Sequence, residues 1–411
     1  MDEGVWSLNF AAFKKMAKTE RLYYTDCYLK EFQAHVVRVS PDAKGVRVFL
    51  DRTAFYPESG GQPVDHGTLA GHPVLDVIEQ GEEIAHVLSE SPKAESIQGM
   101  IDWGRRFDHM QQHTGQHVLS AAFEKTGGYK TMSFHLGTEL STIDLDSDRV
   151  GAKQIETAEE LANQIVFENR PVQISFRGAA EANQLELRKP TFREGDVRLV
   201  EIQEFDLSAC GGTHVRQTGA IGLICIRKVD RTKGLTRVAF VCGGRALRAA
   251  RQDFSTLTEA ARLFSTGLEN VPELITKQSQ ELREAMRERD KLVEALAGFE
   301  ANELWEAAPE RAGMRVVSRR FEAVEGKKAK LMAHAVAKHP SSVALMGVKG
   351  KPATLFFLQS PGGKLSMADV LKQILAKFGG KGGGSRDFAQ GGGLPEEQLE
   401  EALRFAETLL G

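Results

Sequence analysis

The sequence predicts a multidomain α+β protein. A small antiparallel β-barrel is followed by an α+β domain, a helical segment typical of a coiled coil, and a C-terminal α/β domain. Three observations lead to this prediction: short β-rich runs near the N-terminus, mixed helices and strands in the middle, and a seven-residue apolar repeat before the last hundred residues. The corresponding boundaries are 16–100, 101–250, 251–310 and 311–411. At 411 residues the chain is long enough for two to four domains.

The amino-acid composition limits the kinds of partner and cellular compartment that are expected for this protein. The chain is 41% hydrophobic and 27% charged, which is ordinary for a globular protein, and its formal net charge is -3. A nucleic-acid partner must therefore be bound by local basic patches, because the whole molecule offers no positive field. The four cysteines, too scattered for a disulfide framework, favour a reducing compartment: Cys27, Cys210, Cys225 and Cys242. With no apolar run near twenty residues and no leader pattern, we expect a cytoplasmic protein without membrane contact.

The region from about 22 to 87 consists of short β-rich runs that Asp, Gly and Pro interrupt. The runs read AHVVRV, VRVFLD, GTLAGHPVLDVIEQ and EEIAHVL, and they predict the small barrel. A stretch that begins at Thr53, TAFYPESGGQP, contains Gly60 and Gly61, which permit either a tight turn or the close approach of a partner. The first fifteen residues differ in character, and Met16 is an alternative start, so we expect 1–15 to be peripheral.

The region from about 102 to 241 alternates helices with strands. We expect helices at 107–125, 157–169 and 181–187, and strands at 141–146, 172–178, 197–205 and, as a pair, between 219 and 243. This order predicts an α+β domain in which the turn after the strand at 197–205 lies beside the first helix.

The segment between 243 and 311 carries apolar residues at seven-residue spacing. One series, interrupted at Arg289, runs Leu268, Ile275, Leu282 and Leu296. A second series runs Val271, Gln278, Ala285, Leu292 and Phe299. Two interleaved series with charged residues between them are typical of a coiled coil or helical hairpin. The partner of this helix is either the same chain folded back or a second copy of the chain.

The last hundred residues return to an α/β pattern. Strands are expected at 314–321, 341–350 and 352–360, and helices at 326–339, 367–378 and 395–410. Between the last two helices lies a glycine-rich stretch, GGKGGGSRDFAQGGG. A flexible linker is rich in glycine, but it seldom contains side chains such as those of Lys381, Arg386, Asp387, Phe388 and Gln390. We therefore favour a loop that cradles phosphate or contacts RNA.

Two pairs of residues have the spacing of metal ligands. His113 and His117 lie four residues apart in the helix expected at 107–125, so both imidazoles project from one face. Cys210 and His214 repeat this spacing on a glycine-containing turn, ACGGTHV. Sulfur and imidazole donors in this combination suit zinc, and a second pair at the same spacing is hard to obtain by chance. The sequence therefore predicts a four-ligand zinc site.

The chemistry of this zinc stays open on the residues alone. Thr114 stands where metalloproteases of the His-Glu-x-x-His type carry glutamate, which disfavours proteolysis. Four protein ligands usually indicate a structural zinc, unless the metal takes a fifth ligand, one ligand moves away, or a separate group activates water. The nearest polar candidates are Thr131, Ser133 and His135 in KTMSFHLG, where His135 is either a structural histidine or a catalytic group.

The motifs HTGQHVLS, SFHLG and CGGTHV resemble those of the editing domain of alanyl-tRNA synthetases and of their free-standing relatives, the AlaX family. The region with YPESGGQP is similar to the domain that precedes the editing domain. The stretch GGKGGGSRDFAQGGG resembles the glycine-rich part of a DHH-associated domain. Since no aminoacylation domain precedes the barrel, this resemblance over most of the chain implies the long free-standing form, with a zinc-binding editing domain at 101–250 and a DHH-associated domain at 311–411.

The resemblance implies a hydrolase that removes serine from mischarged Ser-tRNA(Ala), with Gly-tRNA(Ala) as a second candidate substrate, and spares Ala-tRNA(Ala). A pocket for alanine cannot strongly exclude serine or glycine, so a second site is needed. The family's zinc ligands map onto His113, His117, Cys210 and His214. The alternative is a tRNA-binding or assembly module with a purely structural zinc.

Further site residues follow from position within the motifs. His135 is the candidate catalytic group. The offset from His117 makes Ser133, and next Thr131, the candidates for binding the serine hydroxyl, while Gly60 and Gly61 are candidates for contact with the substrate.

In the C-terminal domain, the candidates for RNA binding are Lys381, Gly383, Arg386 and Phe388, through phosphate contacts and base stacking. This domain either holds the tRNA elbow or forms a dimer. Nucleases with a similar C-terminal domain also carry an Asp-His-His motif, which this sequence lacks, so phosphodiester cleavage is disfavoured.

Overall fold

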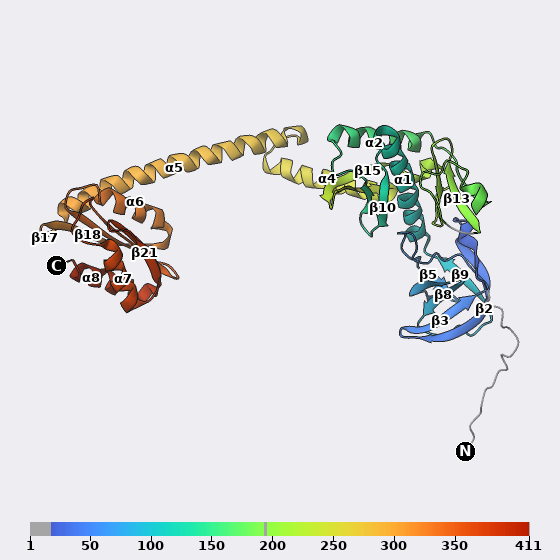
Figure 1. The fold of residues 1–411 in the computed structure, drawn as a ribbon, viewed down its shortest axis with the longest axis horizontal. Coiled ribbons are helices and arrows are strands. Elements are labelled where there is room, and N and C mark those ends of the chain that lie inside the picture. The colour runs from blue at the N-terminus through green and yellow to red at the C-terminus, as the bar shows by residue number, and fades with distance from the viewer. Residues whose placement is uncertain (1–17, 193–194, 411) are drawn as a thin grey trace, which may run out of the picture. The chain divides into compact units, whose positions relative to one another are not determined.

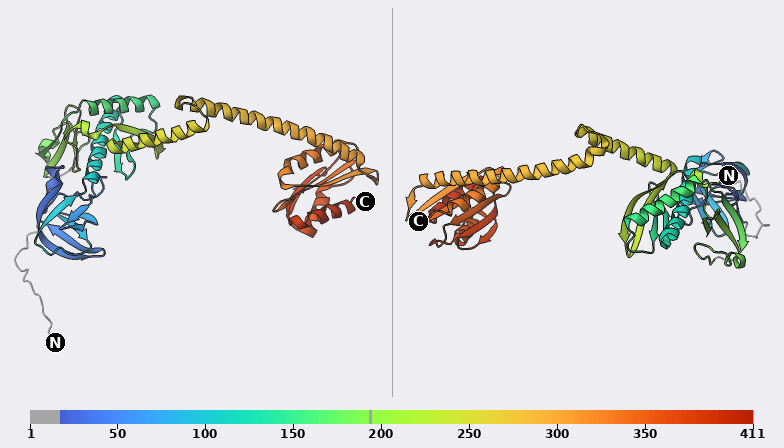
Figure 2. Two further views of the ribbon diagram at one scale, coloured as in Figure 1. Left: turned by 180° about the vertical axis from the view of Figure 1, so that it is seen from behind. Right: turned by 90° about the horizontal axis from the view of Figure 1, so that it is seen from above.

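The structure is a computed structural model that describes residues 18–192 and 195–410 (Figures 1 and 2). The segment predicted to be peripheral, 1–15, lies outside the described residues. The chain divides into two compact units, of which the first ends at Glu259 and the second begins at Ala260. No helix in the described part of the chain is long and apolar enough to cross a membrane.

The first unit begins with a curled antiparallel sheet of seven strands (Figure 1). The strands are β2 (Glu31–Asp42), β3 (Gly45–Leu50), β5 (Gly67–Leu69), β6 (His72–Pro73), β7 (Asp76–Gln80), β8 (Glu83–Leu88) and β9 (Ser96–Ile101). Their order is β6-β5-β9-β2-β3-β8-β7, and a separate parallel pair joins β1 (Glu20–Arg21) to β4 (Arg52–Thr53). The predicted antiparallel character is confirmed. Within the described part of the chain, hydrogen bonds do not close the sheet into the predicted barrel, since β6 and β7 remain its edges.

The helix that carries the two histidines is α1 (Trp103–Gly127). It begins where the Asp102 side chain accepts a hydrogen bond from the Arg105 amide, and it ends at Gly128, whose φ of 71° is a left-handed conformation that glycine adopts without strain. Helix α1 packs against α2 (Ala152–Phe167) and a four-stranded antiparallel sheet. That sheet has the order β10 (Thr131–Leu136), β11 (Ser141–Leu145), β16 (Leu235–Cys242) and β15 (Ile224–Thr232).

A three-stranded antiparallel sheet places the cysteine-bearing turn. It consists of β12 (Val172–Gly178), β13 (Asp196–Ile202) and β14 (Asp206–Ala209), with the short helix α3 (Ala179–Ala182) after β12. The strand expected at 197–205 is therefore two strands joined by a tight turn. Because β14 ends at Ala209, Cys210 follows it directly.

A buried ion pair joins the seven-stranded sheet domain to α1. Arg106 of α1 donates hydrogen bonds to both carboxylate oxygens of Asp65, and neither side chain is exposed to solvent. The same guanidinium donates to the carbonyl oxygens of Cys27 and Ala54. A buried charge pair of this kind is tolerated only when its hydrogen-bonding groups are satisfied, as they are here, so the two parts of this unit have a fixed register.

The helical segment consists of two helices. Helix α4 (Gly243–Leu263) and helix α5 (Val271–Ala307) are separated by a break in which Ser265 has a φ of 51° and a short 3-10 helix (Leu268–Asn270) follows. The first member of the predicted seven-residue repeat, Leu268, therefore lies outside α5. Ala297 and Ala301 near the end of α5 are buried against helix α6 (Gly326–Val336).

Several apolar side chains of α5 in the predicted repeat are exposed within this chain: Ile275, Leu282, Leu292, Leu296 and Phe299.

The remainder of the second unit is a mixed six-stranded sheet covered by helices (Figure 2). Its order is β17 (Glu310–Arg311), β18 (Met314–Phe321), β19 (Ser342–Val348), β20 (Ala353–Gln359), β22 (Phe388–Leu394) and β21 (Lys381–Gly384), with only β18 and β19 parallel. The helices besides α6 are α7 (Met367–Phe378) and α8 (Leu399–Thr408).

The glycine-rich stretch is not the predicted loop. It forms the hairpin of β21 and β22, in which Gly382 pairs with Gly391. A Cβ atom on Gly382 would lie 2.5 Å from the Gly391 Cα, so the close approach of these strands requires glycine.

Candidate metal centre

The four predicted ligands lie together. His113 and His117 come from consecutive turns of α1, and Cys210 and His214 come from the turn after β14. Their ligand atoms all lie within 4.8 Å of one another. The Cys210 Sγ lies 3.4 Å from the His113 Nε2 and 3.3 Å from the His214 Nε2. The three histidines are buried and Cys210 is half-buried.

Gln62 of the YPESGGQP motif fixes the tautomer of His113. The Thr213 backbone amide donates to the Gln62 Oε1 at 3.1 Å, and the Gln62 Nε2 donates to the Thr213 hydroxyl, so the orientation of the carboxamide is determined. The same Oε1 lies 2.8 Å from the His113 Nδ1. Because this oxygen can only accept, the Nδ1 carries the proton and the Nε2 is left with a free lone pair toward Cys210.

The other two histidines have equivalent partners. The His117 Nδ1 lies 3.0 Å from a carboxylate oxygen of Asp206, whose second oxygen accepts from Arg188. The His214 Nδ1 lies 3.2 Å from the Thr114 hydroxyl, which also accepts from the Val215 amide. All three Nε2 atoms are therefore directed to the centre, as metal coordination requires. Thr114, which replaces the protease glutamate, orients a ligand.

The electrostatic environment of the four ligand residues favours the binding of a cation. Burial opposes the Cys210 thiolate, but charge interactions with His113 and His214 outweigh it and hold the pKa of the thiol well below its usual value. Burial also opposes the charged form of His117, yet the hydrogen bond that its Nδ1 donates to the Asp206 carboxylate raises its pKa to about 9. Burial lowers the pKa of His214 to about 3. A thiolate and imidazole nitrogens are a donor set that fits zinc.

The turn between the ligands requires glycine at one position. A Cβ atom on Gly212 would lie 2.1 Å from the His113 Cε1, because the backbone of the turn passes directly over the imidazole ring. A Cβ atom on Gly211 would meet nothing closer than the Tyr24 hydroxyl at 3.5 Å. Arg198 also holds the turn, since its guanidinium donates a hydrogen bond to the Cys210 carbonyl at 2.6 Å.

The two glycines predicted to contact substrate differ in position. Gly60 lines an open cavity of about 340 Å³ beside the cluster, together with Tyr24, Ser59, His113 and Cys210. Gly61 contacts β10 instead: its carbonyl accepts from the Leu136 amide, and a Cβ atom there would lie 2.8 Å from the Phe134 carbonyl oxygen.

The three polar candidates on β10 do not share one face. The Thr131 hydroxyl donates at 2.7 Å to Ser120, which lies on α1 one turn after His117. The Ser133 hydroxyl donates to Asp144 on the outer face of the sheet, away from α1, and His135 is exposed on that same face. A β-bulge between Thr131 and Ser133 causes this difference. The structure therefore brings Thr131, but not Ser133 or His135, to the helix that carries the cluster.

The predicted RNA-binding residues lie on the glycine-rich hairpin. Lys381 and Gly383 are exposed on β21. Arg386 is exposed and donates to the Gly363 carbonyl at 3.0 Å. The Phe388 ring is half-buried and stacks on His334 with a centroid distance of 5.8 Å, so it already has a partner within the domain.

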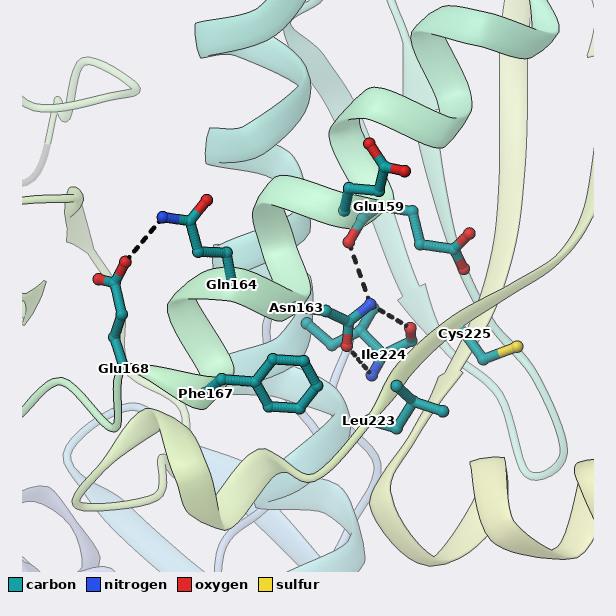
Figure 3. A pocket seen from close by; sticks show the side chains of 9 residues that line it. Glu159, Asn163, Gln164, Phe167, Glu168, Leu223, Ile224 and Cys225 are labelled. Carbon is teal, nitrogen blue, oxygen red and sulfur yellow. Dashed lines mark hydrogen bonds between the residues drawn. The ribbon is translucent and has the colours of Figure 1, made fainter.

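Another cavity lies apart from the cluster. It measures about 840 Å³ and lies between α2 and the start of β15 (Figure 3). Asn163 connects the two elements through hydrogen bonds to the Glu159 carbonyl and to the backbone N–H and C=O of Ile224. Phe167 and Leu223 are the large apolar side chains that line the cavity. None of the predicted catalytic, substrate-binding or metal-binding residues lines this cavity.

Three residues of the centre were not predicted: Gln62, Asp206 and Thr114 as partners of the histidines. Gln62 lies in the YPESGGQP motif, in which only the glycines have an evident conformational role. Asp206 lies four residues before Cys210 without a recognisable spacing.

Two stretches of the chain match known family models. Residues 197–239 match the family described as the threonyl and alanyl tRNA synthetase second additional domain, and residues 313–411 match the DHHA1 domain. A crystal structure of the C-Ala domain of Aquifex aeolicus alanyl-tRNA synthetase aligns with 25% of this chain and 98% of that chain at 24% identity, with a TM-score of 0.24.

Two full-length relatives extend the match over nearly the whole chain. The alanine–tRNA ligase of Pyrococcus abyssi is 33% identical over 98% of this chain, which spans only 45% of that enzyme. The alanyl-tRNA editing protein AlaX-L of Pyrococcus horikoshii is 33% identical over 93% of this chain and 97% of its own length. The chain therefore belongs to the AlaX family of alanyl-tRNA editing proteins, related to the C-terminal part of alanyl-tRNA synthetase.

Proposed function

We propose that this protein hydrolyses the ester bond that joins serine to alanine tRNA, accepts the glycine ester as a second substrate, and spares Ala-tRNA(Ala). One observation carries the proposal: three oriented histidine Nε2 atoms converge on a half-buried cysteine that borders an open cavity of about 340 Å³. Membership of the alanyl-tRNA editing family supplies the substrate class.

The residues present fit a zinc ion held by His113, His117, Cys210 and His214. When bound there, zinc supplies a Lewis acid that polarises the ester carbonyl or a water molecule. The protein's own part is preorganisation, because Gln62, Thr114 and Asp206 hold the imidazoles in one orientation.

The ester approaches the cluster from the cavity lined by Gly60 and Cys210, which is the accessible side. Gly60 lets the backbone come close to the substrate there, since no side chain projects from it.

Discrimination between serine and alanine is assigned to the helix-facing side of β10. The Thr131 hydroxyl, the Ser120 hydroxyl and the Gln116 carboxamide form a hydrogen-bonded chain one turn beyond His117. A hydrogen bond from this chain to the serine hydroxyl would stabilise the serine ester, and alanine, which has no hydroxyl, cannot make it. The placement supports Thr131 over Ser133. A catalytic role for His135 stays a prediction that requires β10 to present its outer face to substrate.

The second unit is proposed to hold the tRNA. Lys381 and Gly383 on exposed β21, and Arg386 in the hairpin turn, offer contacts to phosphate, whereas Phe388 can stack on a base only if it leaves His334. The exposed apolar side chains of α5 are consistent with a homodimer. The free thiol form of all four cysteines suits the cytoplasm, where charged tRNA is used.

The test is deacylation of alanine tRNA charged with serine, glycine or alanine, with and without a zinc chelator. Release of serine alone or of serine and glycine, lost on chelation and restored by zinc, supports the proposal. The four-ligand set also favours the alternative of a tRNA-binding module with a structural zinc. Tight tRNA binding without release of any amino acid would favour that module and contradict the hydrolase.

A further inference from the structure

A second cavity, of about 490 Å³, lies one helical turn from the cluster in the same unit. It is enclosed by the first turns of α1 and α4 and by the turn between β10 and β11. Three arginines line it: Arg105, Arg245 and Arg248. We call it the arginine pocket.

The charge of the arginine pocket is unbalanced. Its one carboxylate, Asp108, is neutralised by Arg245, which donates to both of its oxygens and to the Gly137 carbonyl. Arg105 is held through its Nε by the Val64 carbonyl, which leaves its terminal nitrogens without a partner among residues 18–192 and 195–410. Arg248 is exposed and makes no ion pair in the same described ranges. Two positive charges therefore remain without counter-ions.

His109, which lines this pocket, has a buried polar atom without a partner among the described residues. His109 is 3% exposed, and its Nδ1 makes no hydrogen bond in the described structure. Such an atom is costly to bury unless something binds to it. Burial and then Arg105 and Arg245 lower the pKa of His109 to about 3, so the positive potential of the pocket acts on this imidazole.

The backbone adds to the same potential. Gly104 at the start of α1 and Gly244 at the start of α4 both line the pocket, so two helices of 25 and 21 residues direct their N-terminal amides toward it. Arginine side chains, a buried imidazole nitrogen and two helix N-termini are together suited to a phosphate group.

The position of the pocket identifies the source of the phosphate. His109 precedes His113 by one turn of α1, about 6 Å along the helix axis. Pro63 in the pocket wall follows Gln62, which orients His113. In a charged tRNA, the ester on the terminal ribose is a few covalent bonds from the 5′ phosphate of the same nucleotide.

We propose that the arginine pocket binds the 5′ phosphate of the terminal nucleotide of the aminoacyl-tRNA while the ester lies at the cluster. This inference rests on the proposed deacylation, for which the arginine pocket would position the substrate. Arg248 and His109 are positioning residues that contact the phosphate and not the ester.

The experiment compares two minimal substrates, the 3′-seryl esters of adenosine and of 5′-AMP, which differ only in the phosphate. We expect the wild-type protein to have a kcat/KM about tenfold higher for the 5′-AMP ester. Arg248→Gln and His109→Leu should each remove most of this preference through KM and leave hydrolysis of the adenosine ester unchanged. Arg251→Gln, on the same helix outside the pocket, is the matched control and should keep the preference.

Competition by free phosphate is a second test of the same inference. Inorganic phosphate should compete with the 5′-AMP ester and not with the adenosine ester. Equal rates for the two esters in the wild-type protein, or a preference that survives Arg248→Gln, would overturn the inference even though deacylation itself stands. If neither ester is hydrolysed, the assay with charged tRNA decides on the proposed function. Calorimetry then decides on the pocket alone: tighter binding of 5′-AMP than of adenosine supports it, and equal binding refutes it.

Discussion

The Gln62 Oε1 lies 2.8 Å from the His113 Nδ1 and 3.1 Å from the Thr213 amide, so one carboxamide from the loop between β4 and β5 contacts both the ligand helix and the turn that carries Cys210 and His214. This loop is thereby part of the site. The buried pair of Arg106 and Asp65 holds the same two parts in register.

Replacing Gln62 tests this relationship. Gln62→Ala removes the acceptor that fixes the His113 tautomer, and we expect zinc affinity to fall about 10- to 100-fold. Gln62→Glu keeps an acceptor for both the imidazole and the Thr213 amide, so its affinity should stay within a few-fold of the wild type. Competition with a chromophoric chelator measures both, with circular dichroism as the control for folding. Wild-type affinity in Gln62→Ala would show that the tautomer is fixed by other contacts.

The adjacent glycines of the CGGTH turn make a matched pair. A methyl group on Gly212 would lie 2.1 Å from the His113 Cε1 and 3.0 Å from the Gln62 Oε1, whereas one on Gly211 meets only the Tyr24 hydroxyl at 3.5 Å. We expect Gly212→Ala to lower the free energy of unfolding by about 1–3 kcal/mol and to reduce bound zinc, because the turn must move away from the ring. Gly211→Ala should retain both properties. Metal analysis together with thermal unfolding distinguishes them, and equal behaviour of the two variants would contradict the close approach.

Substrate discrimination can be tested on β10. Thr131→Val retains the shape of the side chain but removes the hydroxyl, so we expect the kcat/KM for Ser-tRNA(Ala) to fall about tenfold or more, with little gain or loss for Gly-tRNA(Ala). Ser133→Ala is the control on the outer face and should leave the ratio of serine to alanine release unchanged. If Ser133→Ala alone abolishes serine release, the outer face of β10 binds the substrate and the assignment to Thr131 is wrong.

The ligand set was predictable because it depends on local spacing. His113 and His117 share a helix face by the period of the α-helix, and Cys210 and His214 share a single turn. Gln62 and Asp206 were not predictable, because their contacts with His113 and His117 span 51 and 89 residues and depend on how three sheets pack.

Two departures of the backbone from simple rules account for the other differences. Strict alternation would put Thr131, Ser133 and His135 on one face of β10, but the bulge after Thr131 places that residue on the opposite face from the other two. Glycine is in general unfavourable in β-strands, so the glycine-rich composition of residues 379–393 predicts a loop. In the structure, β21 and β22 approach so closely that side chains would not fit between them.

The stability of the seven-stranded sheet at acid pH depends on a buried histidine. His86 on β8 is fully buried, its Nε2 lies 2.8 Å from the Thr53 hydroxyl, and burial lowers its pKa to about 4. An unfolded chain takes up this proton below about 6.5, while the folded protein does not do so until about 4. The neutral imidazole therefore contributes stability that is complete above pH 6.5 and is lost as the pH falls toward 4. At about 1.4 kcal/mol per pH unit, this interval corresponds to about 3 kcal/mol.

Hydrogen exchange of the β3 and β8 amides at pH 7 and pH 5 measures this loss where it occurs. We expect protection in these strands to decrease between the two pH values, after correction for intrinsic exchange, and His86→Gln to reduce the decrease because glutamine does not titrate. His35→Gln, at an exposed position on the neighbouring strand β2, is the control and should keep the wild-type decrease. An unchanged pH dependence in His86→Gln would mean that other groups, such as the buried carboxylates, dominate the acid response of this sheet.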